Sequence, residues 1–126
     1  WTQAGGHKQP WLIRPEQGAI AFAGLWDVWE KEGNYLESCT IITTDAAPGI
    51  DRLHNRMPVM LRERDFARWL DVEKPLGDPS DILHSRLPHP FVLAPLSPAI
   101  NNSRHKSEAL LAPVGEAQHI DAVGRE

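Results

Sequence analysis

The sequence predicts an α+β fold in which antiparallel strands dominate and curl into an open, barrel-like sheet with short helices at its margins. Two observations support this fold class. Short apolar or β-branched runs recur along the chain, and each is bounded by glycine, proline or polar residues, which is typical of strands joined by turns. Helical periodicity is confined to short segments, of which residues 62–70 are the clearest. With 126 residues, the chain forms at most one domain.

The first part of the chain is expected to be mostly strand. Residues 1–9 are polar and contain glycine, which indicates a hairpin loop. Gly24 lies within an apolar run and indicates a bulge or a close backbone approach. Residues 27–35 are charged, so we expect an exposed loop there, whereas residues 50–53 are expected to form one helical turn. The expected strands are residues 10–14, 19–26, 37–44 and 57–61.

The second part of the chain is expected to be less regular. Residues 62–70 show the apolar spacing of a short amphipathic helix. Asp78 is suited to cap a helix with Pro79 at its first position, so residues 80–85 are predicted to form a second short helix. Prolines alternate with apolar residues in 88–96, which indicates an edge strand or an extended segment. Residues 1–116 are assigned to the domain and 117–126 to a flexible tail.

The composition limits the classes of function. There are 13 basic and 17 acidic residues, which argues against general coating of nucleic acid but allows a local basic groove. A single cysteine, Cys39, excludes an internal disulfide framework and fits a reducing compartment. Neither a membrane-spanning apolar run nor the apolar core of a signal peptide is seen, so we expect no membrane partner. The histidines lack ligand spacing, so we expect no metal and no cofactor.

The sequence His54-Asn55-Arg56 places three polar side chains directly before the apolar run Met57–Leu61. Histidine exchanges protons near neutral pH, and arginine suits phosphate. If both side chains face one cleft, that cleft can bind a phosphodiester and perform acid–base chemistry. The alternative is that His54 and Arg56 only cap and solvate a turn before a strand. These residues alone favour the alternative.

Four motifs in order resemble the SOS response-associated peptidase (SRAP) family. They are residues 22–26, residues 37–44, residues 54–58, and Asn101-Asn102 followed by residues 107–111. Members of the family sense abasic sites in single-stranded DNA. The resemblance implies that an N-terminal cysteine forms a thiazolidine crosslink with the abasic sugar, through Schiff-base chemistry. It also implies that His54 is a general acid–base, that Thr43 lies in the same pocket and that Arg56 contacts the DNA backbone.

The resemblance begins at Trp1, which matches the tryptophan that follows the catalytic glutamate of the family. The family's catalytic cysteine precedes the matching region, so residues 1–116 are expected to be the C-terminal portion of a single SRAP-like domain. Cys39 is internal and has no free α-amine, so it cannot replace that cysteine. Whether this chain is an enzyme by itself is therefore left open. The missing N-terminal half is a possible partner, beside single-stranded DNA with an abasic site.

Three further residues are candidates for contacts with DNA. Trp1 can stack on a base, Asn55 can donate hydrogen bonds and Arg104 can meet phosphates, although rim packing, turn formation and solvation are the simpler roles. Two other functions are open: a thiol-dependent peptidase of the SOS response, and an inactive or partner-binding half. We expect a bacterial cytoplasmic location, with association with the nucleoid during DNA repair.

Overall fold

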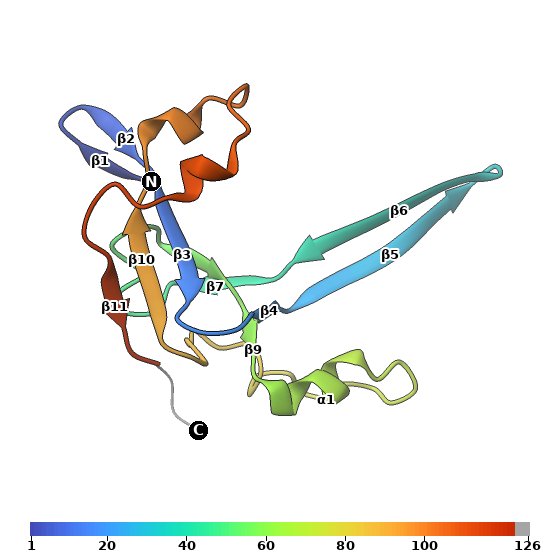
Figure 1. The fold of residues 1–126 in the computed structure, drawn as a ribbon. Helices are drawn as coiled ribbons and strands as arrows, with labels where there is room; N and C mark the ends of the chain where they lie inside the picture. The colour runs from blue at the N-terminus through green and yellow to red at the C-terminus, as the bar shows by residue number, and fades with distance from the viewer. Residues whose placement is uncertain (123–126) are drawn as a thin grey trace.

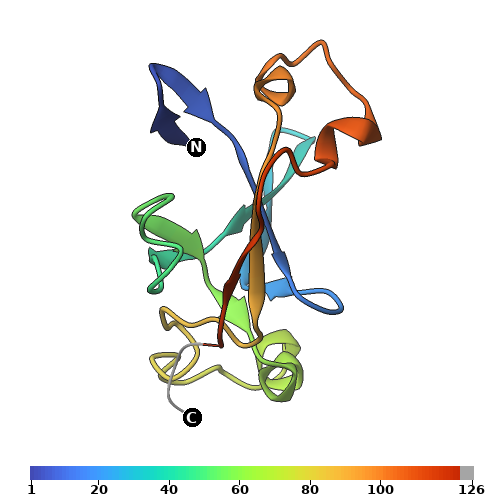
Figure 2. The ribbon, with the colours of Figure 1, turned by 60° about the vertical axis from the view of Figure 1, so that its left-hand side comes forward.

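The structure is a computed structural model that describes residues 1–122; positions 123–126 lie outside the described residues. Within this range the strands pair antiparallel in five small sheets, and the helices are few and short (Figures 1 and 2). The predicted class, a mainly antiparallel α+β fold with short flanking helices, is confirmed, and the described strands form several small sheets and no closed barrel. The strands are β1 (Thr2–Ala4), β2 (His7–Gln9), β3 (Trp11–Pro15), β4 (Ala21–Phe22), β5 (Gly24–Lys31), β6 (Asn34–Ile41), β7 (Thr43–Asp45), β8 (Arg56–Pro58), β9 (Met60–Leu61), β10 (Phe91–Pro95) and β11 (Gln118–Ile120).

Strand β10 is the central strand of a three-stranded sheet in the order β11-β10-β3 (Figure 1). Its residues 91–94 are buried. The prediction of an edge strand or extended segment over 88–96 is therefore corrected to a central strand. The prolines do not prevent this, because Pro90 precedes the strand and Pro95 ends it. The backbone N–H groups between them remain free to pair with both neighbours.

Strand β11 lies in the segment 117–126, which was predicted to be a flexible tail. Residues 118–120 instead pair antiparallel with β10, with Ile120 opposite Phe91. The side chain of Ile120 is half-buried and packs against the hydrophobic core. The free edge of β10 supplies the hydrogen-bond partners, which a local reading of the sequence does not reveal. Positions 123–126 of the predicted tail lie outside the described residues.

The β5–β6 hairpin, residues 24–41, extends away from the other strands, and we call it the arm (Figure 1). The exposed loop predicted for 27–35 is therefore corrected to two paired strands. Lys31 pairs with Asn34, which leaves Glu32 and Gly33 as a two-residue turn. Both turn residues have positive φ, 52° and 79°, as a type I′ hairpin turn requires. Residues 27–31 lie in β5 and residues 34 and 35 in β6, so only Glu32 and Gly33 form the loop.

The base of the arm is fixed by backbone hydrogen bonds. Ala23, Ile42 and Val59 form a closed ring of three backbone hydrogen bonds. The N–H of Ile42 donates to the carbonyl of Ala23 at 2.9 Å, and the N–H of Ala23 donates to the carbonyl of Val59 at 2.9 Å. The N–H of Val59 donates to the carbonyl of Ile42 at 2.8 Å. At Gly24 an added Cβ would lie 3.3 Å from the carbonyl oxygen of Thr40. The predicted close backbone approach at Gly24 is therefore confirmed.

The segment Met57–Leu61 contributes to both clusters of buried side chains. Pro58 is half-buried, and the other members of this segment are buried. One cluster lies beneath β7 and β8, and the other packs towards α1. The buried members are Ala47, Ile50, Leu53, Met57, Met60, Leu87, Phe91 and Leu93 in the first cluster and Ala23, Val59, Leu61 and Ile82 in the second.

The helices are short. The predicted helix over 62–70 is confirmed as a 3₁₀ turn that leads into α1. The predicted helix over 80–85 is instead a turn, in which Ile82 and Leu83 both donate to the carbonyl of Pro79. Among residues 1–122, no helix is long and apolar enough to cross a membrane. The helices are η1 (Glu63–Asp65), α1 (Phe66–Leu70), η2 (Pro98–Asn101) and η3 (Glu108–Leu111).

Candidate functional site

A helical turn anchored in the core positions His54. The N–H of Ile50 donates to the carbonyl of Ala47 at 3.0 Å, and the N–H groups of Leu53 and His54 donate to the carbonyl of Ile50 at 2.8 and 3.2 Å. Ala47, Ile50 and Leu53 are buried. The turn predicted for this segment is therefore confirmed. Since its apolar residues are buried, the backbone of His54 is held at the surface at a defined place.

The His54 ring has a backbone partner in either protonation state. Its Nδ1 lies 3.0 Å from the backbone nitrogen of Arg56 and 3.0 Å from the Arg56 carbonyl oxygen. A backbone N–H can only donate, so Nδ1 accepts that bond when it carries no proton, and a protonated Nδ1 can donate to the carbonyl instead. The Nδ1 atom therefore has a backbone partner with or without a proton.

The Arg56 guanidinium lies along strand β7. Strand β8 pairs with β7 so that Arg56 faces Asp45 directly. The Nη1 of Arg56 donates to the Asp45 carboxylate at 2.7 Å, and its Nη2 donates to the carbonyl and the hydroxyl oxygens of Thr43 at 2.8 and 3.1 Å. The structure thus brings together His54, Arg56 and Thr43, which the sequence proposed as one site. Both members of the Arg56–Asp45 ion pair are exposed, so this pair contributes little to stability.

An apolar pocket of about 190 Å³ opens beside His54 and Arg56. Its walls come from β3, β4, β8, β9 and β10, so that segments distant in the sequence converge here. The polar groups are confined to His54 and Arg56. A ligand with an apolar face and an anionic group fits this combination. The apolar lining residues are Ile13, Pro15, Ile20, Phe22, Ile50, Met57, Pro58, Met60 and Phe91.

Asn55 lies between His54 and Arg56 in the chain and is exposed. Its carbonyl accepts a hydrogen bond from the N–H of Ala46 at 3.0 Å, which closes the loop between β7 and β8. Among the described residues, the Asn55 side chain takes no part in the hydrogen bonds. The backbone of Asn55 therefore shapes the turn, and its amide is available to a ligand.

Trp1 and Arg104 belong to a different end of the molecule, formed by the β1–β2 hairpin and η2 (Figure 1). The indole N–H of Trp1 donates to the side-chain oxygen of Asn101. The side-chain nitrogen of Asn101 donates to the carbonyl of Lys8 at 3.0 Å. The backbone N–H of Arg104 donates to the side chain of Asn102 at 3.0 Å, so the Arg104 guanidinium remains exposed. Trp1 and Arg104 thus belong to a group of residues that is separate from the one around His54.

Sequence reasoning missed Asp45 and Asn101. Asp45 follows two threonines at the end of a strand, and its partner becomes evident only when the register of β7 and β8 is known. Asn101 joins Trp1 to the loop after η2 across 100 positions of the sequence. The Asn101-Asn102 pair is one of the motifs that resemble the SRAP family, and this resemblance was the available signal for Asn101. Asp45 neutralises Arg56, whereas Asn101 fixes Trp1.

The clear shifts of pKa lie outside this site. A hydrogen bond from Arg68, at 2.6 Å, lowers the pKa of Asp81 and raises that of Arg68. Burial lowers the pKa of Arg86, whose Nε has no hydrogen-bond partner among the described residues. Residues 1–122 contain no group of three or more histidine, cysteine or acidic side chains that can hold a metal.

Comparison with known proteins identifies the family. Residues 1–103 match the profile of the family described as SOS response associated peptidase (SRAP). The chain belongs to the SRAP family. A crystal structure of a protein from Bacteroides thetaiotaomicron superimposes with a TM-score of 0.73 at 20% identity, over 90% of this chain and 52% of that chain. This likeness supports the fold.

Curated relatives of this SRAP chain carry names that refer to abasic sites. The abasic site processing protein HMCES of Rattus norvegicus is 37% identical over 99 residues, which are 75% of this chain and 27% of the relative. The abasic site processing protein YoqW of Bacillus subtilis is 43% identical over 69 residues, which are 54% of this chain and 30% of the relative. The SRAP chain therefore spans about a third or less of the length of these two proteins.

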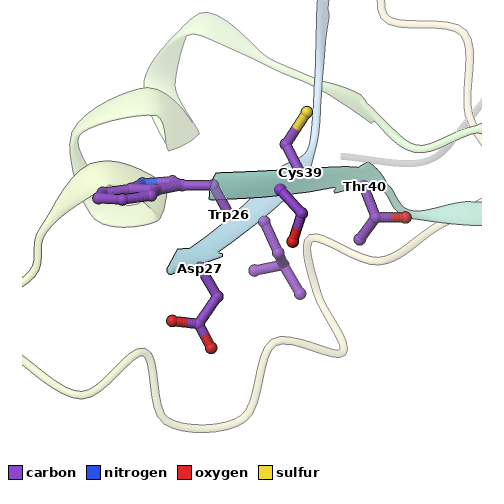
Figure 3. Close-up of a pocket in the computed structure, with 6 residues that line it drawn as sticks. Trp26, Asp27, Cys39 and Thr40 are labelled. Carbon is purple, nitrogen blue, oxygen red and sulfur yellow. The ribbon is translucent and has the colours of Figure 1, made fainter. Parts of the chain in front are cut away.

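The SRAP chain has a second hollow, of about 370 Å³, at the base of the arm (Figure 3). Trp26 and Asp27 of β5 and Cys39 and Thr40 of β6 line it, and the Cys39 and Asp27 side chains point to opposite sides of the hairpin. Cys39 is a free, exposed thiol. Cys39 and His54 line different hollows, so among the described residues they do not form a nucleophile–base pair.

Proposed function

We propose that this chain supplies the acid–base and phosphate-binding part of a site that processes abasic sites in single-stranded DNA. The single observation that carries the proposal is the contact between His54 and Arg56 at the mouth of an apolar pocket, in a chain that belongs to the SRAP family. The names of the relatives support the abasic site as the target. The single cysteine fits action in a reducing compartment such as the bacterial cytoplasm, at the nucleoid.

Each group has a distinct role in this proposal. Arg56 exchanges the Asp45 carboxylate for a DNA phosphate, because a guanidinium suits both anions. The apolar pocket accepts the abasic sugar, whose lack of a base leaves it small enough to enter. Thr43 holds the Arg56 guanidinium through its carbonyl and hydroxyl oxygens. Asn55, Trp1 and Arg104 extend the contact along the strand, with Trp1 as a stacking platform.

The proposed reaction is a covalent crosslink through an N-terminal cysteine that lies outside this chain. The cysteine amine adds to the sugar aldehyde, and the loss of water leaves an imine. The thiol of the same cysteine then adds across the carbon–nitrogen double bond and closes a thiazolidine, so water is the only by-product. His54 takes the proton from the attacking amine and delivers one to the departing hydroxyl. Peptide hydrolysis by Cys39 gains no support from the described contacts.

Binding to DNA is tested with a labelled single-stranded oligonucleotide that contains one abasic site. Fluorescence anisotropy compares it with the intact strand and with a duplex. We expect Arg56→Ala to weaken binding about tenfold, as for the loss of a charge-assisted hydrogen bond. Arg64→Ala, which removes an exposed arginine of η1, is the matched control and leaves the affinity unchanged. Equal binding by both variants would contradict the role of Arg56.

The crosslink is tested by adding the part of the Bacillus subtilis YoqW chain that this chain does not match. The product is a band of DNA and protein that resists denaturation. We expect His54→Ala to slow its formation by about 100-fold, within the range for general acid–base catalysis, with little change in DNA affinity. His84→Ala removes another exposed histidine and serves as the control. If His54→Ala crosslinks at the rate of that control, His54 is not the acid–base group.

A further inference from the structure

The turn that carries His54 begins at a backbone N–H whose acceptor is a sulfur atom. The N–H of Ala47 donates to the Sδ of Met57 at 3.3 Å, and no other acceptor for it is found in residues 1–122. Ala47 is completely buried and Met57 is 3% exposed, so solvent does not replace the sulfur. A thioether is a weak acceptor, but a buried N–H without any acceptor is costly. Met57 therefore has a polar role besides its packing in the core.

Met57 joins the two segments that carry the candidate site. It directly follows Arg56 in β8. On the other side of the sulfur, the carbonyl of Ala47 accepts from the N–H of Ile50, and the carbonyl of Ile50 accepts from the N–H of His54. A chain of hydrogen bonds thus leads from the Met57 sulfur through Ala47 and Ile50 to His54. This chain ties the backbone of His54 to the strand that presents Arg56.

Ile120 of β11 contacts the same turn at Gly49. A Cβ atom added to Gly49 would lie 2.7 Å from the Cδ1 and 3.0 Å from the Cγ2 of Ile120. Gly49 also has a φ of +93°, a conformation that favours glycine. The Ile120 side chain therefore lies against the bare backbone of the turn, and its own backbone is held by pairing with β10. The match to the family profile ends at residue 103, so this contact comes from a strand outside the matched residues.

We propose that Met57 and Ile120 are positioning residues for His54. Met57 fixes the start of the turn through its sulfur, and Ile120 fixes the turn at Gly49 through van der Waals contact. With the turn fixed, the Nδ1 of His54 lies 3.0 Å from the backbone nitrogen of Arg56. The consequence for catalysis rests on the proposed function, whereas the placement of His54 does not.

The role of the sulfur is tested by replacing it alone. The chain has two methionines, Met57 and Met60, so a Met60→Leu background leaves position 57 as the only one exchanged, and each comparison is made within that background. Norleucine replaces the sulfur by a methylene, and selenomethionine keeps an acceptor. Amide hydrogen exchange, followed by NMR without DNA, measures opening of the turn. We expect norleucine to speed exchange at Ala47 and His54 about tenfold, and selenomethionine to change it less than about twofold.

The role of Ile120 is tested in the same way. Ile120→Ala removes the side-chain atoms that contact Gly49, and Ile120→Val removes only Cδ1. We expect Ile120→Ala to speed exchange at His54 about tenfold and Ile120→Val about threefold. His119→Ala changes the exposed neighbour in β11 and leaves this exchange unaltered. The amide of Leu93, which is buried in β10, is the internal reference.

The consequence for chemistry is measured in the crosslinking assay with the YoqW segment. Norleucine at position 57 and Ile120→Ala are expected to lower the crosslinking rate at saturating DNA about fivefold, with unchanged DNA affinity. Three results would overturn the inference: unaltered exchange of the turn, equal acceleration at Leu93, or crosslinking at the unaltered rate. Failure of the unaltered chain to crosslink, with the expected exchange of the turn, would count only against the proposed function.

Discussion

Strands β6 and β7 are consecutive parts of one extended segment, residues 34–45, yet they have different surroundings. All of β6 is exposed, and its partner β5 is nearly so. Strand β7 pairs with β8, whose Met57 is buried in the core. Backbone pairing is therefore similar in both hairpins, and they differ in the side chains that pack against them. Buried core residues pack against the β7–β8 hairpin, whereas among the described residues most of the arm is exposed on both faces.

The polar groups of the two hairpins differ in the same way. Arg56 has three oxygen acceptors on Asp45 and Thr43, so its charge is matched within the site. The arm carries an excess of carboxylates beside exposed tryptophans. The site hairpin thus carries a paired charge, whereas the charges of the arm are mostly of one sign.

Val59 lies where the arm meets the site and is completely buried. Val59→Asp places an unpaired carboxylate in the core and is expected to destabilise the fold by about 4 kcal/mol or more. Val72→Asp, at a position that is 96% exposed, is expected to cost less than about 0.5 kcal/mol. Urea unfolding followed by circular dichroism measures both. If the two variants unfold at similar urea concentrations, the arm and the site do not share a core at Val59.

Asp45→Asn tests whether the ion pair with Asp45 competes with DNA phosphate for the Arg56 guanidinium. The exposed Arg56–Asp45 pair contributes about 0.2–1 kcal/mol, so stability changes little. Release of Arg56 is expected to tighten binding of single-stranded DNA by up to about fivefold, measured by anisotropy. Asp27→Asn removes the same unit of charge from the arm and is the control. Weaker binding by Asp45→Asn would show that Asp45 instead positions Arg56 for DNA.

The sequence was informative where the pattern is local. Residues 10–14 and 57–61 were predicted as strands because their apolar runs are bounded by turn residues, and one helical turn was predicted before His54. The arm was missed because its charged residues resemble those of a loop. The available signal for a hairpin was Gly33, which lies between two segments that each contain aromatic and aliphatic side chains.

The remaining differences arise from pairing between distant segments. Residues 88–96 were predicted to be an edge strand or an extended segment because of their prolines, and residues 117–126 were predicted to be a tail. Both predictions used local sequence only, which does not reveal that β10 and β11 pair with each other. The site depended on the family resemblance for the grouping of His54, Arg56 and Thr43. The register that sets Asp45 against Arg56 is a property of the folded sheet. Local patterns therefore identified most strands, and tertiary pairing decided the details of the site.

The smallest expected effect is on the stability of the arm itself. Trp29→Thr/Leu36→Thr replaces exposed apolar side chains by another good strand former. Trp29 and Leu36 are 54% and 60% exposed and form one cross-strand pair, so the free energy of unfolding should fall by about 1 kcal/mol or less. Urea unfolding measures it, with Val59→Asp as the contrast. A loss of several kcal/mol would mean that these two side chains are a main source of the stability of the folded chain.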